Sequence, residues 1–314
     1  MAVAGPNPRP GWFAVPAPVR ELFKLFPLTT LPADPLPERA PERTRPRPRL
    51  YVFARTDEDA RHGRPSFNPQ CLKWQTFLRI AGVEVDIVPS TNHASPSGAL
   101  PFLLPPTIAQ PSSSTTEPRP KPTPALKPTI PLTGSKIERY AKDHASHEIP
   151  TDSSSSPSRI EAYEALLPQS LRPAWLLTLY LDPLNTSLLK TLYLPPSPIL
   201  QLPSLHALRN AASAEILKTT RSAIISPDQL LSDATDALRS LSALLSDDEW
   251  FFGRPEPSLF DADVFAYTYL ILDPQFGWAA DDHSLAKCLV KFGNLVEHRR
   301  RLYERCWPES RGEK

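Results

Sequence analysis

The apolar positions in the first half of the chain follow the two-residue period of β-strands in some segments and the helical period in others. Four short runs are β-branched, aromatic or alternating, and these predict strands over residues 49–54 (RLYVFA), 83–88 (VEVDIV), 99–104 (ALPFLL) and 130–134 (IPLTG). The last run is expected at a sheet edge. With helices after the first and last runs, the order predicts a small α/β domain.

The first of these helices carries local start and stop signals. Asn68 is a favoured N-cap residue, and Pro69 suits the first helical position because that amide would have no helical partner. The helix is expected to stop at Gly82, a residue typical of the position after a helix end. A second helix is expected over residues 135–145, with the hydroxyl of Ser135 as its cap.

From residue 158 onward the apolar residues recur with helical spacing. This spacing predicts helices over residues 158–167, 171–181, 205–221, 227–245, 259–272 and 282–304, with a break at Pro168. Two of the helices begin with a capping box. Ser226 with Gln229 forms one, and Ser258 with Asp261 forms the other, where an aspartate replaces the usual glutamate.

Prolines divide the chain into parts. There are 40 among 314 residues, about one in eight against about one in twenty in an average chain. They gather in a leader (1–48), in a Pro/Ser/Thr insertion (105–131) and in a segment expected to be an extended crossing (194–203). The insertion has too few large apolar side chains to offset the entropy of ordering it, so it is expected to be flexible.

The predicted organisation has two domains. An α/β domain (49–147) and an all-helical domain (158–306) are joined by a polar linker, and a short tail (307–314) follows them.

Composition excludes several classes of protein. The net charge is +1, which gives no bulk field for nucleic acid. No apolar run approaches the length of about 18 residues that suggests a transmembrane helix. Cys71, Cys288 and Cys306 are odd in number and far apart, so neither a zinc site nor a disulfide framework is expected, which fits a reducing compartment. The N-terminus lacks the basic-then-apolar pattern of a secretory signal.

This order of elements resembles the glutathione-transferase-like fold, a thioredoxin-like N-terminal domain followed by an all-helical C-terminal domain (α+β, then α). Leu100-Pro101 stands where that fold has a proline before the third strand, usually with a cis peptide bond. Ser258 and Asp261 match the capping box that opens a buried helix of the second domain in that fold.

Longer segments resemble the metaxin family and its fungal relatives. Residues 68–105 are similar to the N-terminal signature, in which a helix, a strand, a Ser-Pro-Ser-Gly loop and a Leu-Pro strand follow each other. Residues 248–272 resemble the C-terminal signature, an aromatic-Gly turn followed by the capping box and Asp-Ala-x-Val-Phe, and residues 172–185 also look like the family. The Pro-rich leader looks like that of the fungal receptor-type subunit of the mitochondrial outer-membrane sorting and assembly machinery.

The resemblance implies a role that is not catalytic, with no cofactor and no metal. Such subunits lie on the cytosolic face of the mitochondrial outer membrane as peripheral proteins. They bind the barrel-forming core subunit and a second metaxin-like subunit. With them they help to recognise the β-signal of β-barrel precursors and to insert these precursors into the membrane.

Cys71 carries the main alternative, a glutathione-dependent transferase or thiol-transferase. It lies in the first turn of the predicted helix, where the dipole and free amides can lower a thiol pKa. Against this, the sequence C-L-K-W lacks a second cysteine of a redox pair, and Cys71 lies past the helix tip. Because a free cysteine is commonly buried, a packed thiol is the simpler interpretation.

Other candidate side chains have simple structural interpretations. Ser135 resembles the serine that binds glutathione at a helix start, but the insertion separates it from Pro101, and helix capping explains it. Four histidines, His62, His93, His144 and His147, have no metal-ligand spacing and are expected to be solvated.

The leader contains one amphipathic segment. Val19, Leu22, Phe23 and Phe26 share one face of a short helix, which must dock on the helical domain, a partner or a membrane, since it is marginal alone. The basic run Arg39–Arg49 is expected to be a solvated linker, with contact to anionic lipid as the alternative.

Two ways of holding a β-signal remain open from the sequence. One is strand addition at an exposed sheet edge, near residues 130–133, and the other is an apolar groove between helices. A third possibility is that the chain acts by stabilising the barrel subunit, which then pairs with the signal.

Overall fold

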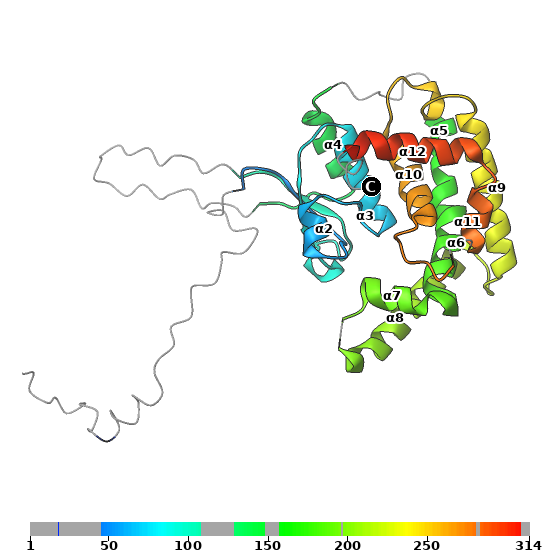
Figure 1. Ribbon diagram of the computed structural model, residues 1–314, viewed down its shortest axis with the longest axis horizontal. Helices are drawn as coiled ribbons and strands as arrows, with labels where there is room; N and C mark the ends of the chain where they lie inside the picture. The colour runs from blue at the N-terminus through cyan, green and yellow to red at the C-terminus, as the bar shows by residue number, and fades with distance from the viewer. Residues whose placement is uncertain are drawn as a thin grey trace, which may run out of the picture. The chain divides into compact units, whose positions relative to one another are not determined.

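The computed structural model describes residues 18, 45–107, 129–147, 157–195, 197–280 and 283–308 (Figure 1). All of them except Pro18 belong to one compact unit, Arg39–Lys314. The predicted leader helix around residues 19–26 lies outside the described residues, as do most of the insertion and the linker.

The sheet has three described strands in the order β2-β1-β3, namely β1 (Arg49–Val52), β2 (Asp86–Pro89) and β3 (Phe102–Leu104). β2 is parallel to β1, with Leu50 opposite Ile87, and β3 is antiparallel, with Leu50 opposite Leu103. β1 is buried from Leu50 to Val52, so the sheet centre forms part of the core.

The sheet differs from the prediction at its two flanks. β2 begins at Asp86 rather than at residue 83, because the chain still turns through Gly82 (φ 68°) and Val83, whose N–H bonds to the Leu78 carbonyl. The predicted strand at 130–134 is wrong. Only Leu132 pairs with β3, through Leu103, since the next residues that face this edge from β3, Pro101 and Pro105, have no N–H to extend the ladder.

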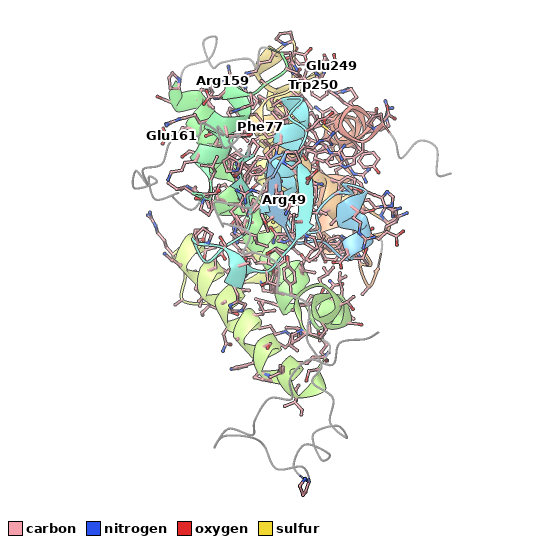
Figure 2. The ribbon with its side chains drawn as sticks, turned by 90° about the vertical axis from the view of Figure 1, so that its left-hand side faces the viewer. Arg49, Phe77, Arg159, Glu161, Glu249 and Trp250 are labelled. Carbon is pink, nitrogen blue, oxygen red and sulfur yellow. The ribbon has the colours of Figure 1, made fainter. Side chains whose placement is uncertain are left out.

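The described residues of this module form three helices, α2 (Asp57–Arg61), α3 (Pro69–Ile80) and α4 (Ser135–Asp143), with a 3₁₀ turn at Asn92–Ala94. α3 begins after Asn68 and stops before Gly82, as predicted. Figure 2 shows the side chains of this module, with Arg49 at the start of β1 and Phe77 on α3. At α4 the cap is Gly134 (φ 53°), not Ser135, which is the first helical residue and is exposed. The predicted serine cap is therefore wrong.

The remaining described residues are helical. The helices are α5 (Pro157–Leu166), α6 (Arg172–Leu176), α7 (Thr186–Tyr193), α8 (Pro198–Thr220), α9 (Pro227–Leu245), α10 (Leu259–Leu272), α11 (Ser284–Leu289) and α12 (Gly293–Cys306). Short 3₁₀ turns lie at Pro183–Asn185 and Phe251–Gly253. None of the described helices combines the length and the apolar character needed to cross a bilayer.

Prolines interrupt these helices less than the sequence indicates. The predicted break at Pro168 is wrong, because a wider π-helical turn, Leu167–Leu171, carries the chain from α5 directly into α6. A second such turn, Leu177–Leu181, follows α6. Such turns tolerate the missing proline N–H without ending the helix.

Two other helix boundaries also differ from the prediction. The extended crossing expected over 194–203 ends early, because α8 starts at Pro198 and runs through Pro203. The expected helix over 282–304 is two helices, separated at Val290–Phe292, and His283 caps the first of them.

The core joins the sheet module to the helical part. α3 packs against α10 in the middle of the fold, where Phe77 and Phe265 are fully buried (Figure 1). Trp307, which the sequence assigns to the tail, is only 4% exposed. Its indole N–H donates to the Gly63 carbonyl (2.8 Å), and Arg79 stacks on its ring. Trp307, directly after α12, therefore packs against the sheet module and ties the end of the helical part to it.

Arg45 joins the two ends of the insertion. This residue belongs to the run expected to be a solvated linker, yet it is 0% exposed, so the expectation is wrong at this position. Its guanidinium donates to the hydroxyls of Thr107 and Thr129, and its backbone pairs with Thr107. Buried charge needs such partners, and here they come from both sides of the insertion.

Candidate functional site

The start of α3, where the sheet module meets the helical part, is the place where the sequence suggested chemistry. Asn68 Oδ1 accepts from the amides of Gln70 (3.0 Å) and Cys71 (3.3 Å), and the Asn68 carbonyl accepts from Leu72 (2.8 Å). Pro69 has no N–H. The first amides of the helix are therefore all used within the chain, which leaves none of them to bind an anion or stabilise a thiolate.

The side chain of Asn68 is also held from the helical part. Its Nδ2 donates to the hydroxyl of Tyr193, at the end of α7 (3.0 Å). The Tyr193 ring packs edge-on against Phe53 and Phe67, with ring centroids 5.2 Å apart in both pairs, and Tyr180 packs beside it at 5.6 Å. Four aromatic rings thus gather around the tip of α3.

Cys71 in the first turn of α3 is fully buried, with its thiol beside the Phe53 backbone and Ser66. Burial raises the pKa of its thiol to about 12, and hydrogen bonds from the Phe53 backbone and Ser66 offset only part of that rise. The packed thiol that the sequence favours is therefore confirmed, and the lowered pKa that the transferase alternative requires is not found. Desolvation exceeds the dipole effect because the helix amides already have partners.

Charged groups lie farther along the same junction. Lys73 on α3 pairs with Asp263 on α10, and each side chain is 18% exposed. Burial raises the pKa of Asp263, and Lys73 opposes that rise. Burial also raises the pKa of Tyr267 to about 12. Arg172 pairs with Glu215, which links α6 to α8.

A second polar cluster surrounds the start of α10. The Asp261 carboxylate is 0% exposed and accepts from the amides of Phe251 (3.0 Å) and Ser258 (2.8 Å), from the Ser258 hydroxyl (2.7 Å) and from His298 Nε2 (3.0 Å). Ser258 and Asp261 thus occupy the capping positions that the sequence predicts, with the aspartate returning to the cap amide.

The other predicted capping box does not form. Ser226 precedes α9 but makes no capping bond with its side chain. The Gln229 side chain instead donates along the helix to Asp233 (2.7 Å). This finding corrects the prediction at α9, although the helix starts where expected.

Two family models match the chain. One, described as the glutathione S-transferase N-terminal domain, covers residues 69–185, and the other, the glutathione S-transferase C-terminal domain, covers residues 234–302. The first match begins at α3 and continues past α6 into the helical part, and the second covers most of the helices from α9 to α12. The chain has a glutathione-transferase-like fold.

Solved structures with this fold are similar at low sequence identity. A glutathione transferase from Burkholderia graminis, with two glutathione molecules bound per subunit, is 16% identical, with 82% of this chain and 84% of that chain covered and a TM-score of 0.46. The β-etherase from Sphingobium sp. is 15% identical, covering 82% and 98%, with a TM-score of 0.43. A glutathione S-transferase from Rhodospirillum rubrum is 15% identical, covering 82% and 87%, with a TM-score of 0.42. No curated protein matches the sequence.

In this glutathione-transferase-like fold, Pro101 occupies the position expected of it. The Leu100-Pro101 bond is cis, and the loop before it is held by Asn92 Oδ1, which accepts from the Leu100 amide (3.0 Å). Ser135 does not join Cys71 in a site, because it is exposed on α4 while the thiol is buried.

The remaining candidate residues are not gathered into a metal site. His62, His93, His144 and His147 are exposed. Within the described ranges, no group of three His, Cys, Asp or Glu side chains is arranged to hold a metal ion.

Sequence reasoning missed several residues that shape these sites, namely Tyr193, the Lys73–Asp263 pair, His298 and Arg45. Each depends on a partner far away along the chain, so no local pattern marks it.

Proposed function

We propose that this chain is a non-enzymatic, metaxin-like subunit of the mitochondrial outer-membrane sorting and assembly machinery. One observation carries the proposal: at the tip of α3 the first amides, the Asn68 side chain and the Cys71 thiol are all committed to the chain's own structure. With no free amide and no thiolate at this tip, the fold is better suited to binding proteins than to catalysis with glutathione. The resemblance of residues 68–105 and 248–272 to the metaxin signatures directs the proposal to this machinery.

The proposed place is the cytosolic face of the outer membrane, in a peripheral position. The proposed partners are the barrel-forming core subunit, a second metaxin-like subunit and β-barrel precursors carrying a β-signal. Side chains of the sheet module and of the helical part form one packed core, which leaves no room for a partner between them. Partners would therefore bind the outer surface of the chain.

The edge of β3 is a poor place for a β-signal to add as a strand. The backbone of Leu103 faces outward there and already bonds to Leu132 in both directions (2.8 Å each). Its neighbours on that edge, Pro101 and Pro105, have no N–H to offer. We therefore assign this chain a supporting role in precursor insertion, through the barrel subunit, rather than strand pairing at β3.

Affinity isolation tests the assembly role. The tagged full chain is isolated from mitochondria solubilised in mild detergent, beside an equally expressed, tagged outer-membrane protein of another complex. The barrel subunit is expected in a near-stoichiometric amount with this chain and absent from the control. Its absence from both samples would overturn the proposal.

An activity assay tests the enzymatic alternative. The purified chain is given glutathione and a thiol-transfer substrate, beside a Cys71→Ala variant. Equal background rates are expected, because the thiol is buried and protonated. Turnover that depends on Cys71 would favour the transferase and contradict the non-enzymatic role.

A further inference from the structure

The first turns of α8 carry large aliphatic side chains in solvent. Ile199 is 85% exposed, Leu202 is 72% exposed and Leu200 is 52% exposed, whereas Leu205 on the next turn is buried. The turns follow directly after α7, and both helices lie at the bottom of Figure 1. Pro203 lies exposed among them. Aliphatic side chains adjacent on one short stretch form an apolar patch, which we call the α8 tip (residues 199–203).

The sequence around the α8 tip has no charged side chain. Between Lys190 and Arg209 there is no Asp, Glu, Lys or Arg. Arg209, the first charge after the patch, is turned back onto the fold, where it donates to the Tyr180 carbonyl (3.0 Å) and the Thr186 hydroxyl (2.6 Å). A partner that covers the α8 tip would therefore desolvate no ion, which suits a medium of low dielectric.

Two kinds of partner can cover such a patch, and its size separates them. A stable protein interface buries about 800 Å² on each partner. The exposed side chains of the α8 tip are Ile, Leu and Pro, on little more than one helical turn. Shallow burial of apolar side chains in a bilayer has no such threshold, because its strength scales with the apolar area that is buried.

We propose that the α8 tip inserts into the interfacial region of a lipid bilayer through Ile199, Leu200 and Leu202. The contact is apolar, so it requires neither anionic lipid nor low salt. With so few side chains, the binding is reversible and acts together with other contacts of the chain. This inference stands on the exposure and charge of α8 and does not depend on the proposed assembly role.

Vesicle flotation with the purified full chain tests the inference. The vesicles contain only phosphatidylcholine and phosphatidylethanolamine, which are neutral overall. The test variant is Ile199→Ser with Leu202→Ser, and the matched control is Ile224→Ser with Val290→Ser, because these residues are also exposed, at 76% and 57%, but lie elsewhere. Since all four side chains are solvated, the melting temperatures should remain near that of the wild type.

The wild type and the control are expected to float with the vesicles, while the test variant loses at least about tenfold in partition coefficient. Added salt should leave the wild-type binding unchanged. A wild type that fails to bind, or a test variant that binds equally well, would overturn the inference. So would a wild type that self-associates in sedimentation equilibrium while the test variant does not, because the patch would then be a protein contact.

The two proposals fail separately. A chain that floats with vesicles but does not isolate the barrel subunit keeps the lipid contact and loses the assembly role. A chain that isolates the barrel subunit but does not float keeps the assembly role and loses the lipid contact.

Discussion

The buried thiols show how strongly local surroundings control the chemistry of a side chain. Burial raises the pKa of Cys71 and of Cys306 to about 12, and in Cys306 the nearby Arg79 and Arg305 offset only part of the rise. The thiolate is the reactive form of cysteine. At neutral pH both side chains therefore remain almost wholly protonated and behave as small packed groups.

Alkylation should reveal this protection. With iodoacetamide at about pH 8, where an exposed cysteine is already partly ionised, Cys71 and Cys306 should stay unlabelled in the native chain. In denaturant both should react rapidly. Peptide mass mapping distinguishes the sites, and labelling of Cys71 under native conditions would contradict its burial.

The same two thiols make stability depend on alkaline pH. In the unfolded chain they lose their protons near pH 9.0, whereas in the folded chain they keep them up to about 12. A raised folded pKa gives stability that is fully present below the unfolded value and is lost as the pH rises through the folded value. The free energy of unfolding should therefore fall between about pH 9 and pH 12.

Denaturant titrations across this range measure the effect. The Cys71→Ala variant should show a shallower fall than the wild type, because one of the two thiols is gone. An identical slope in both proteins would mean that Cys71 is not desolvated.

Helix starts differ in how much they depend on one side chain. In the first turn of α10 the buried Asp261 carboxylate has four hydrogen-bond donors, while Ser226, which precedes α9, makes no side-chain capping bond. Removing the Asp261 carboxylate leaves several of these buried donors without an acceptor. One of them is His298, whose Nδ1 already has no partner. An unsatisfied buried group costs much more than a lost exposed cap.

Asp261→Ala should therefore lower the free energy of unfolding by about 3 kcal/mol, above the roughly 1 kcal/mol typical of a cap. Asp228→Ala, in the exposed first turn of α9, is the matched control and should cost less than about 0.5 kcal/mol. Chemical denaturation of both variants provides the comparison. Equal costs would show that the cluster around Asp261 adds nothing beyond helix capping.

The predictability of the elements follows from where their signals lie. α3 could be placed to within about two residues because Asn68, Pro69 and Gly82 act on their own neighbours. The continuous path of the helix through Pro168 could not be predicted, because the π-helical turn there depends on how α5 and α6 pack. The split between α11 and α12 could not be predicted either, because the helical spacing of apolar residues continues across it without a break.

The two parts of the fold are joined by an ion pair as well as by apolar packing. Lys73 and Asp263 connect α3 to α10, and burial raises the pKa of Asp263 even with Lys73 beside it. A carboxyl with a raised folded pKa stabilises most at low pH and loses that contribution as the pH rises through the folded value. Lys73 limits this loss near neutral pH.

Lys73→Met should therefore destabilise the chain by about 1–2 kcal/mol near pH 7, a value reduced for the partial exposure of the pair. The cost should shrink toward about pH 4, where Asp263 takes up a proton. The double variant Lys73→Met/Asp263→Asn removes both charges and should recover most of the loss. Thermal melts at the two pH values check this, and a cost independent of pH would exclude the ionised carboxyl as its cause.

Much of the candidate site could not be predicted because it depends on distant pairs. The cap formed by Asn68 is local and could be predicted, but its bond to Tyr193 joins residues 125 positions apart. The burial of Cys71 likewise involves the segment before α3, where the Phe53 backbone and Ser66 lie beside its thiol. The sequence therefore indicated where chemistry could occur, but the contacts that bury the Cys71 thiol carry no local signal.

The contacts of Arg45 have a practical use. Because this side chain binds both Thr107 and Thr129, the two residues that flank positions 108–128 are held next to each other by the folded module. Each doubling of the length of a loop between fixed ends costs only about 0.6 kcal/mol. A fluorescent reporter or an affinity tag could thus be spliced between positions 108 and 128, giving a handle for imaging the chain in cells.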